Sequence, residues 1–161
     1  AIWGLIFLGV LAAYGLWDDI RATVHPRQAI VADGRQISVP RARDGHYYLT
    51  LDVNGQPVEF LVDTGASQMV LNAAVAERIG IETSGLAYLG RAMTANGEVR
   101  TARVKLDTVT LGPVTDRNVV AWVNEGELDQ SLLGMGYLQR FSGIEIRNNE
   151  LILTRQPMAT A

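Results

Sequence analysis

Short runs of alternating apolar and polar residues, separated by turn residues, occur from Ile37 onward. Alternation of this kind is typical of β-strands that bury one face, so this part of the chain is predicted to be a β-rich domain. The runs HYYLTLDV and PVEFLVD flank Asn54-Gly55, a dipeptide that strongly favours a tight hairpin turn. We therefore expect a hairpin whose second strand ends at Asp63.

A short helix is predicted after this hairpin. In the segment NAAVAERIG, Asn72 is a suitable N-cap, apolar residues recur at helical spacing, and Gly80 is a typical C-terminal stop. Asp63 is thus expected to lie between a strand and a helix.

A long two-stranded hairpin is predicted in the segment LAYLGRAMTANGEVRTARVKLDTVTLG. Its tip is expected at residues 94–97, because Asn96-Gly97 marks another tight turn. A further strand is expected around residues 119–123. The last hairpin, GIEIRNNELIL, is expected to turn at Asn148-Asn149. Together these elements predict one domain over residues 37–155, followed by a C-terminal tail over residues 156–161.

The N-terminal segment differs from the rest of the chain. Residues 1–17, AIWGLIFLGVLAAYGLW, contain no charged residue and carry aromatic residues near both ends, which is typical of a membrane interface. A helix of this length spans roughly 25 Å, slightly less than a bilayer core. A signal peptide or a buried helix are the alternatives, but LAAYGLW is a poor cleavage site. The pattern favours a transmembrane anchor, joined to the domain by a polar tether over residues 18–36.

Composition narrows the possible functions. The chain has 161 residues, which is enough for one domain with its own core, and a net charge of -3 with no basic block. Binding to nucleic acid is therefore not expected. The absence of cysteine excludes disulfides and thiolate chemistry, and the two histidines, His25 and His46, lie in unrelated contexts. A histidine-based metal site within one chain is not expected either.

The candidate chemistry lies in Asp63-Thr64-Gly65, directly after an apolar run. Burying a carboxylate among apolar residues costs free energy, unless the carboxylate is paired with another charge, is hydrogen-bonded or has a functional role. Gly65 lets a backbone amide approach the carboxylate closely, and the Thr64 hydroxyl can brace the loop against a neighbour. Two such carboxylates sharing one proton can act as base toward water and as acid toward an amide. The alternative is a strand-end aspartate that merely caps a turn.

A second motif, Leu132-Leu133-Gly134, follows about 70 residues after the aspartate. The two motifs together resemble the retropepsin-like aspartic proteases, in which an Asp-Thr-Gly loop, a glycine-containing flap hairpin and an apolar-apolar-Gly strand form the active site. The resemblance covers about residues 37–153 and is strongest to bacterial, membrane-anchored members, in GHYY, VNG, FLVDTGAS, TANG and LLGMGYL.

The resemblance implies an all-β, retropepsin-like barrel with one or two short helices, preceded by a single N-terminal transmembrane helix. It implies Asp63 as the catalytic residue and Leu132, Leu133 and Gly134 as the motif that packs under its loop. It also implies that the active-site loop is supported by Thr64, Gly65, Ala66 and Ser67. The flap that it implies consists of Thr94, Ala95, Asn96 and Gly97.

The expected activity is hydrolysis of peptide bonds by water, with no metal or organic cofactor. Because the sequence lacks a second Asp-Thr-Gly or Asp-Ser-Gly, a homodimer with one aspartate from each chain is expected. The substrate is expected to be a protein or peptide bound as an extended strand. The expected location is the inner membrane, as a single-pass protein with the protease domain on the periplasmic side. The alternative functions are a catalytically silent binding or dimerisation module and a scaffold for membrane partners.

Overall fold

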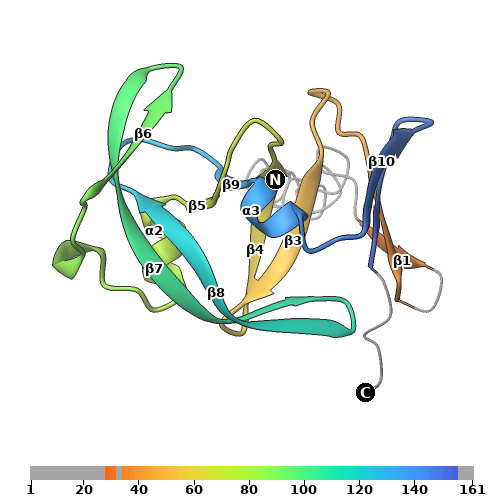
Figure 1. Cartoon of the computed structure of the whole chain (residues 1–161), viewed down its shortest axis with the longest axis horizontal. Helices are drawn as coiled ribbons and strands as arrows, with labels where there is room; N and C mark the ends of the chain where they lie inside the picture. The colour runs from red at the N-terminus through yellow and green to blue at the C-terminus, as the bar shows by residue number, and fades with distance from the viewer. Residues whose placement is uncertain (1–27, 32–33, 156–161) are drawn as a thin grey trace, which may run out of the picture.

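The computed structural model describes residues 28–31 and 34–155, whose strands form two sheets (Figure 1). The larger sheet has seven strands. In spatial order they are β3 (Tyr48–Val53), β4 (Gln56–Val62), β9 (Ser131–Leu133), β5 (Met69–Leu71), β8 (Val114–Asn124), β7 (Gly97–Leu111) and β6 (Gly90–Thr94). Because β3 also pairs with β7, six strands close into a barrel and β6 extends beyond it. The expected all-β, barrel-like fold is confirmed.

The smaller sheet contains four strands from the two ends of the described chain. Its order is β1 (Ala29–Val31), β2 (Gln36–Pro40), β11 (Glu150–Thr154) and β10 (Gly143–Arg147). The strands β1 and β2 both begin before Ile37, where the domain was expected to start, so the sheet extends into the segment predicted as a tether. The predicted anchor, residues 1–17, and the predicted tail, residues 156–161, lie outside the described residues. Within the described residues, no helix is long and apolar enough to cross a membrane.

Among the described residues, two short α-helices accompany the sheets. The first, α2 (Ala73–Arg78), begins after Asn72, whose side chain accepts a hydrogen bond from the Val75 amide at 2.8 Å. This is the helix and the N-cap that the sequence predicted. The second, α3 (Met135–Leu138), follows β9, and a 3-10 turn, η1 (Thr83–Gly85), lies between α2 and β6.

The predicted tight turns follow from residues that tolerate positive φ angles. Asn54 and Gly55 have φ angles of 51° and 82° in the turn between β3 and β4. Asn148 and Asn149 have φ angles of 51° and 60° between β10 and β11. Both central residues of each loop are left-handed, as the favoured two-residue hairpin turn requires. Both predicted hairpins are confirmed.

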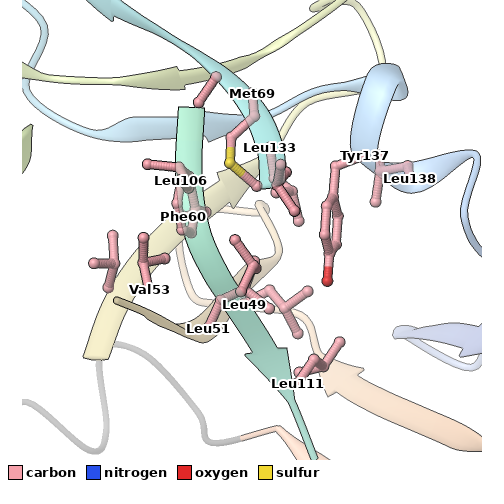
Figure 2. Close-up of a cluster of buried hydrophobic side chains, with 14 of the residues drawn as sticks. Leu49, Leu51, Val53, Phe60, Met69, Leu106, Leu111, Leu133, Tyr137 and Leu138 are labelled. Atoms are coloured by element: carbon pink, nitrogen blue, oxygen red, sulfur yellow. The ribbon is translucent and has the colours of Figure 1, made fainter. Parts of the chain in front are cut away.

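The core fills the barrel with the apolar residues of the alternating runs. In β3, for example, Leu49, Leu51 and Val53 are fully buried, whereas Thr50 and Asp52 are exposed. Figure 2 shows the ring of Tyr137, from α3, directed into this cluster. The alternation of polar and apolar residues therefore fixes which face of each strand is buried.

Candidate active site

Asp63 lies at the end of β4, in a loop over residues 63–68 that leads to β5. Its Oδ1 atom accepts a hydrogen bond from the Gly65 amide at 2.9 Å, and its carbonyl oxygen accepts one from the Ala66 amide at 3.2 Å. A Cβ atom on Gly65 would lie only 3.2 Å from this Oδ1, so glycine permits the close approach. The side chain is half-buried rather than enclosed among the apolar runs that flank it.

The strand β9 holds both ends of this loop. It runs parallel to β4, with Val62 opposite Leu133, and antiparallel to β5, with Met69 opposite Leu133. The amide of Asp63 donates a hydrogen bond to the carbonyl oxygen of Leu133 at 3.1 Å. Leu133 is fully buried beneath the loop. The strand that carries the second motif thus fixes the position of the aspartate.

Glycines bring the chain after β9 directly under the loop. The amides of Met135 and Gly136 donate to the carbonyl oxygens of Ala66 and Ser67 at 2.8 and 2.9 Å. A Cβ atom on Gly134 would lie 2.5 Å from the Ala66 oxygen, which is closer than any real contact of that kind. Any side chain at this position would displace the loop.

The hairpin of β6 and β7 is the predicted flap. Thr94 pairs with Gly97 at its tip, and the Thr94 hydroxyl accepts from the Asn96 amide at 3.2 Å and donates to the Gly97 carbonyl oxygen at 2.8 Å. Gly97 has a φ angle of 112°, a conformation that favours glycine. Figure 1 shows this hairpin at the opposite side of the molecule from the four-stranded sheet.

The loop and the flap border one cleft of about 700 Å³. Most of the sequence-predicted residues line it: Asp63, Gly65, Ala66, Ser67, Thr94, Ala95 and Leu132. The other predicted residues, Thr64, Asn96, Gly97, Leu133 and Gly134, do not line it. Thr64 is exposed, and its side chain forms no hydrogen bond within residues 28–31 and 34–155. In the same part of the chain, no three His, Asp or Glu residues gather as a metal site.

The sequence and the fold of this chain are similar to those of known proteins. The family model described as "gag-polyprotein putative aspartyl protease" matches residues 49–140, which include the loop, the flap and β9. A crystal structure of a retropepsin-like aspartic protease from Rickettsia conorii shares 39% sequence identity with a TM-score of 0.69, over 74% of this chain and 90% of that chain. The chain belongs to the retropepsin-like family of aspartic proteases.

Two further matches are consistent with a retropepsin-like chain. The protein named "Uncharacterized protein in cobV 5'region", from Sinorhizobium sp, is 36% identical over 165 residues, which cover 95% of this chain and 71% of that protein. The EIAV protease, in complex with the inhibitor HBY-793, has 21% identity and a TM-score of 0.52, over 60% of this chain and 88% of that chain. This last likeness shows a shared fold.

Sequence reasoning missed one wall of the retropepsin-like cleft. Trp122 and Asn124 from β8 and Thr101 from β7 line it. Thr101 lies directly across from Asn124 in the β7–β8 ladder. A signal for this pairing was present in Gly112-Pro113, because a two-residue loop there, with Gly112 at a φ angle of 57°, fixes the register of the ribbon.

A partly buried ionic cluster lies at the other end of β8. Asp116 of β8 binds Arg155 at 2.6 Å and Arg140 at 3.4 Å, and both Asp116 and Arg155 have side chains only 16% exposed. Arg155 also lies 5.0 Å from the centre of the Phe141 ring. Tyr137 is buried beside these charges, and burial raises the pKa of its hydroxyl to about 12. The cluster therefore joins β8, the end of β11 and the chain around α3.

Proposed function

We propose that this chain is an aspartic endopeptidase that hydrolyses peptide bonds of protein substrates, and that it acts as a homodimer with one Asp63 from each chain. The observation that carries the proposal is the position of Asp63, half-buried at the floor of a cleft that the flap hairpin borders. The sequence contains one Asp-Thr-Gly and no second motif of this type. A site with two carboxylates therefore needs a second copy of the chain.

The reaction uses both carboxylates of the dimer. Two adjacent carboxylates cannot both ionise easily, so they share one proton. The ionised Asp63 takes a proton from water while the water oxygen bonds to the carbonyl carbon of the substrate. The protonated Asp63 then supplies the proton that the departing amide nitrogen needs, and the carbon–nitrogen bond breaks. Water is the nucleophile, and no metal or cofactor is required for these steps.

The substrate is expected to lie as an extended strand between the loop and the flap. The strand β6 is the last strand of its sheet, so one edge of it has no neighbour among the described strands. An extended peptide can pair with such an edge through main-chain hydrogen bonds, while its side chains enter the cleft. This arrangement gives affinity from the backbone and selectivity from the cleft walls.

The proposed location is the inner membrane, with the protease domain on the periplasmic side. The uncharged segment over residues 1–17 supports this proposal. Confinement to a membrane would raise the effective concentration of the two chains of a dimer. The test is fractionation of cells that express the full chain, followed by added protease on intact and permeabilised cells. Recovery in the soluble fraction would contradict the proposal.

The activity is tested by incubating the full chain with a peptide library and comparing it with Asp63→Asn. The amide keeps the volume of the carboxylate but cannot share the proton, so turnover should fall at least about 10²- to 10⁴-fold. Asp107→Asn is the matched control, because Asp107 is exposed on β7 outside the cleft. Turnover by Asp63→Asn close to that of the control would place the catalytic group elsewhere. Peptide binding without turnover by the unaltered chain would favour the silent binding module.

A further inference from the structure

Two buried polar residues line the cleft at the base of the β6–β7 hairpin. Thr101 is 6% exposed and Asn124 is 3% exposed, and both line the cleft. They are direct partners in the β7–β8 ladder, so their side chains lie next to each other on one face of the ribbon. Ser131, another buried polar residue, accepts a hydrogen bond from the Asn72 amide and is thereby satisfied.

The orientation of the Asn124 side chain follows from its one internal hydrogen bond. Its Oδ1 atom accepts from the Gly126 amide at 3.0 Å, so its Nδ2 donors point elsewhere. Over residues 28–31 and 34–155, no group of the chain accepts from Nδ2, and none bonds to the Thr101 hydroxyl. The unpartnered side-chain atoms that are fully enclosed in the described structure belong to Tyr137 and Arg155. The free atoms of Thr101 and Asn124 are thus reached from the cleft.

The surroundings limit what can bind between these two residues. Trp122 lies on the same face of β8, two residues before Asn124, and forms an aromatic wall. At the base of the flap, a Cβ atom on Gly90 would lie 2.4 Å from the Thr101 hydroxyl and 3.0 Å from the Trp122 ring. The chain therefore passes very close to this wall. The space beside the Thr101 hydroxyl is therefore narrow, which favours a slim side chain over a bulky one.

Among the described residues, Arg91 is the basic residue that lines the cleft, and it is paired, whereas Arg103, on the same face of β7 two residues from Thr101, is exposed and lies outside the cleft lining. Arg91 binds Glu98 at 3.2 Å across the flap, and Arg100 binds Glu125 at 2.6 Å. A substrate carboxylate would meet no free cation among these groups, and burying an unpaired charge is costly. A neutral carboxamide avoids this cost. It offers an oxygen that can accept from Asn124 Nδ2 and an amide that can donate to the Thr101 hydroxyl.

We propose that Thr101 and Asn124 form a subsite that selects a substrate residue with a carboxamide side chain, asparagine or glutamine. The proposal rests on the proposed function, because it treats the cleft as the substrate site. Neither residue takes part in bond cleavage. They act as specificity-determining residues, since a buried hydrogen-bonding site discriminates against side chains that leave its polar groups unpaired.

Binding to the inactive full chain, Asp63→Asn, separates this proposal from catalysis. The probes are peptides that carry Gln, Glu or Leu at one position at a time, and their Kd values are measured. At one position, the Gln peptide should bind about 10-fold or more tightly than the Glu and Leu peptides. Thr101→Val, which keeps the shape of threonine, should reduce this preference to about twofold without weakening the Leu peptide. Thr115→Val, on the exposed part of β8, is the matched control and should keep the preference.

Each outcome decides between the two proposals. A preference for Glu or Leu at every position, no preference at all, or an unchanged preference in Thr101→Val would overturn the subsite, even if the unaltered chain cleaves peptides. A Gln preference that disappears in Thr101→Val, in a chain that cleaves no peptide, would support the subsite and contradict the endopeptidase. Asn124→Leu adds a second variant, with loss of the same preference as the expected result.

Discussion

At the flap end of the β7–β8 ribbon the ion pairs are exposed, whereas at the other end they are partly buried. Arg100 and Glu125, near the flap, are 63% and 39% exposed, but Asp116 and Arg155, near the opposite turn, are each only 16% exposed. An exposed ion pair contributes about 0–1 kcal/mol to the free energy of unfolding, because water screens both charges. Loss of one partner from a buried pair costs about 3–5 kcal/mol, because the other charge stays buried.

The contrast distinguishes the part of the ribbon that is joined to the loop from the part that we expect to be mobile. In the partly buried cluster, Asp116 binds Arg155 at the end of β11 and Arg140 just after α3. The helix α3 begins with the amides that donate hydrogen bonds to the Asp63 loop. The flap end has exposed charges, and the polar atoms of Thr101 and Asn124 are open to the cleft. The proposed function requires a fixed loop and a mobile flap, because the cleft would have to admit a peptide and then exclude water.

The largest predicted effect on stability concerns the partly buried ion pairs of Asp116. Asp116→Ala leaves Arg155 and Arg140 without their carboxylate, so the free energy of unfolding should fall by about 1–3 kcal/mol, between the values for exposed and fully buried pairs. Glu125→Ala is the matched control at the flap end and should cost less than about 1 kcal/mol. Denaturant unfolding monitored by circular dichroism measures both. Equal losses in the two variants would contradict the contrast.

The next effect depends on pH. Burial raises the pKa of Tyr137 from 10.0 to about 12, so the folded chain retains this proton where the unfolded chain loses it. The stability that this group contributes is complete below pH 10 and is lost as the pH rises toward 12. The loss should be about 1–3 kcal/mol.

Tyr137→Phe tests this expectation, because it removes the titrating hydroxyl and keeps the ring. The fall in stability between pH 10 and 12 should become shallower than in the unaltered chain. Tyr48 titrates in the same range, because burial and its hydrogen bond to Asp44 raise its pKa to about 12. Tyr48→Phe is therefore the parallel variant. An unchanged slope in Tyr137→Phe would contradict the assignment.

The smallest predicted effect on stability belongs to the flap tip. Gly97→Val places a β-branched residue at a φ angle of 112°, although no atom lies within 4 Å of the added Cβ. The strain stays local, so the free energy of unfolding should change by about 1 kcal/mol or less, while kcat/KM falls by a larger factor. Gly85→Ala, with an ordinary φ angle and open space, should change neither. A stability loss that accounts for the whole loss of turnover would count against a mobile flap.

Local signals account for most of what the sequence predicted. Asn54-Gly55 and Asn148-Asn149 fixed two hairpins, and Asn72 fixed the start of α2, because each acts through its own backbone. The closure of β3 onto β7 and the ion pairs of Asp116 with Arg140 and Arg155 depend on contacts between distant residues. Alternation alone does not specify such register. The partly buried cluster around Asp116 was missed for this reason, whereas the pairing of Thr101 with Asn124 was predictable from the turn at Gly112-Pro113.

The central claim, one aspartate from each of two chains, is tested most directly by mixing. A fixed amount of unaltered chain is equilibrated with increasing amounts of Asp63→Asn under conditions where the chains exchange, and peptide hydrolysis is measured. If each site needs two carboxylates, mixed dimers are inactive, so a ninefold excess of Asp63→Asn should reduce the activity to about one tenth. Activity that stays constant through this excess, with mixed dimers demonstrated by differently tagged chains, would contradict the account.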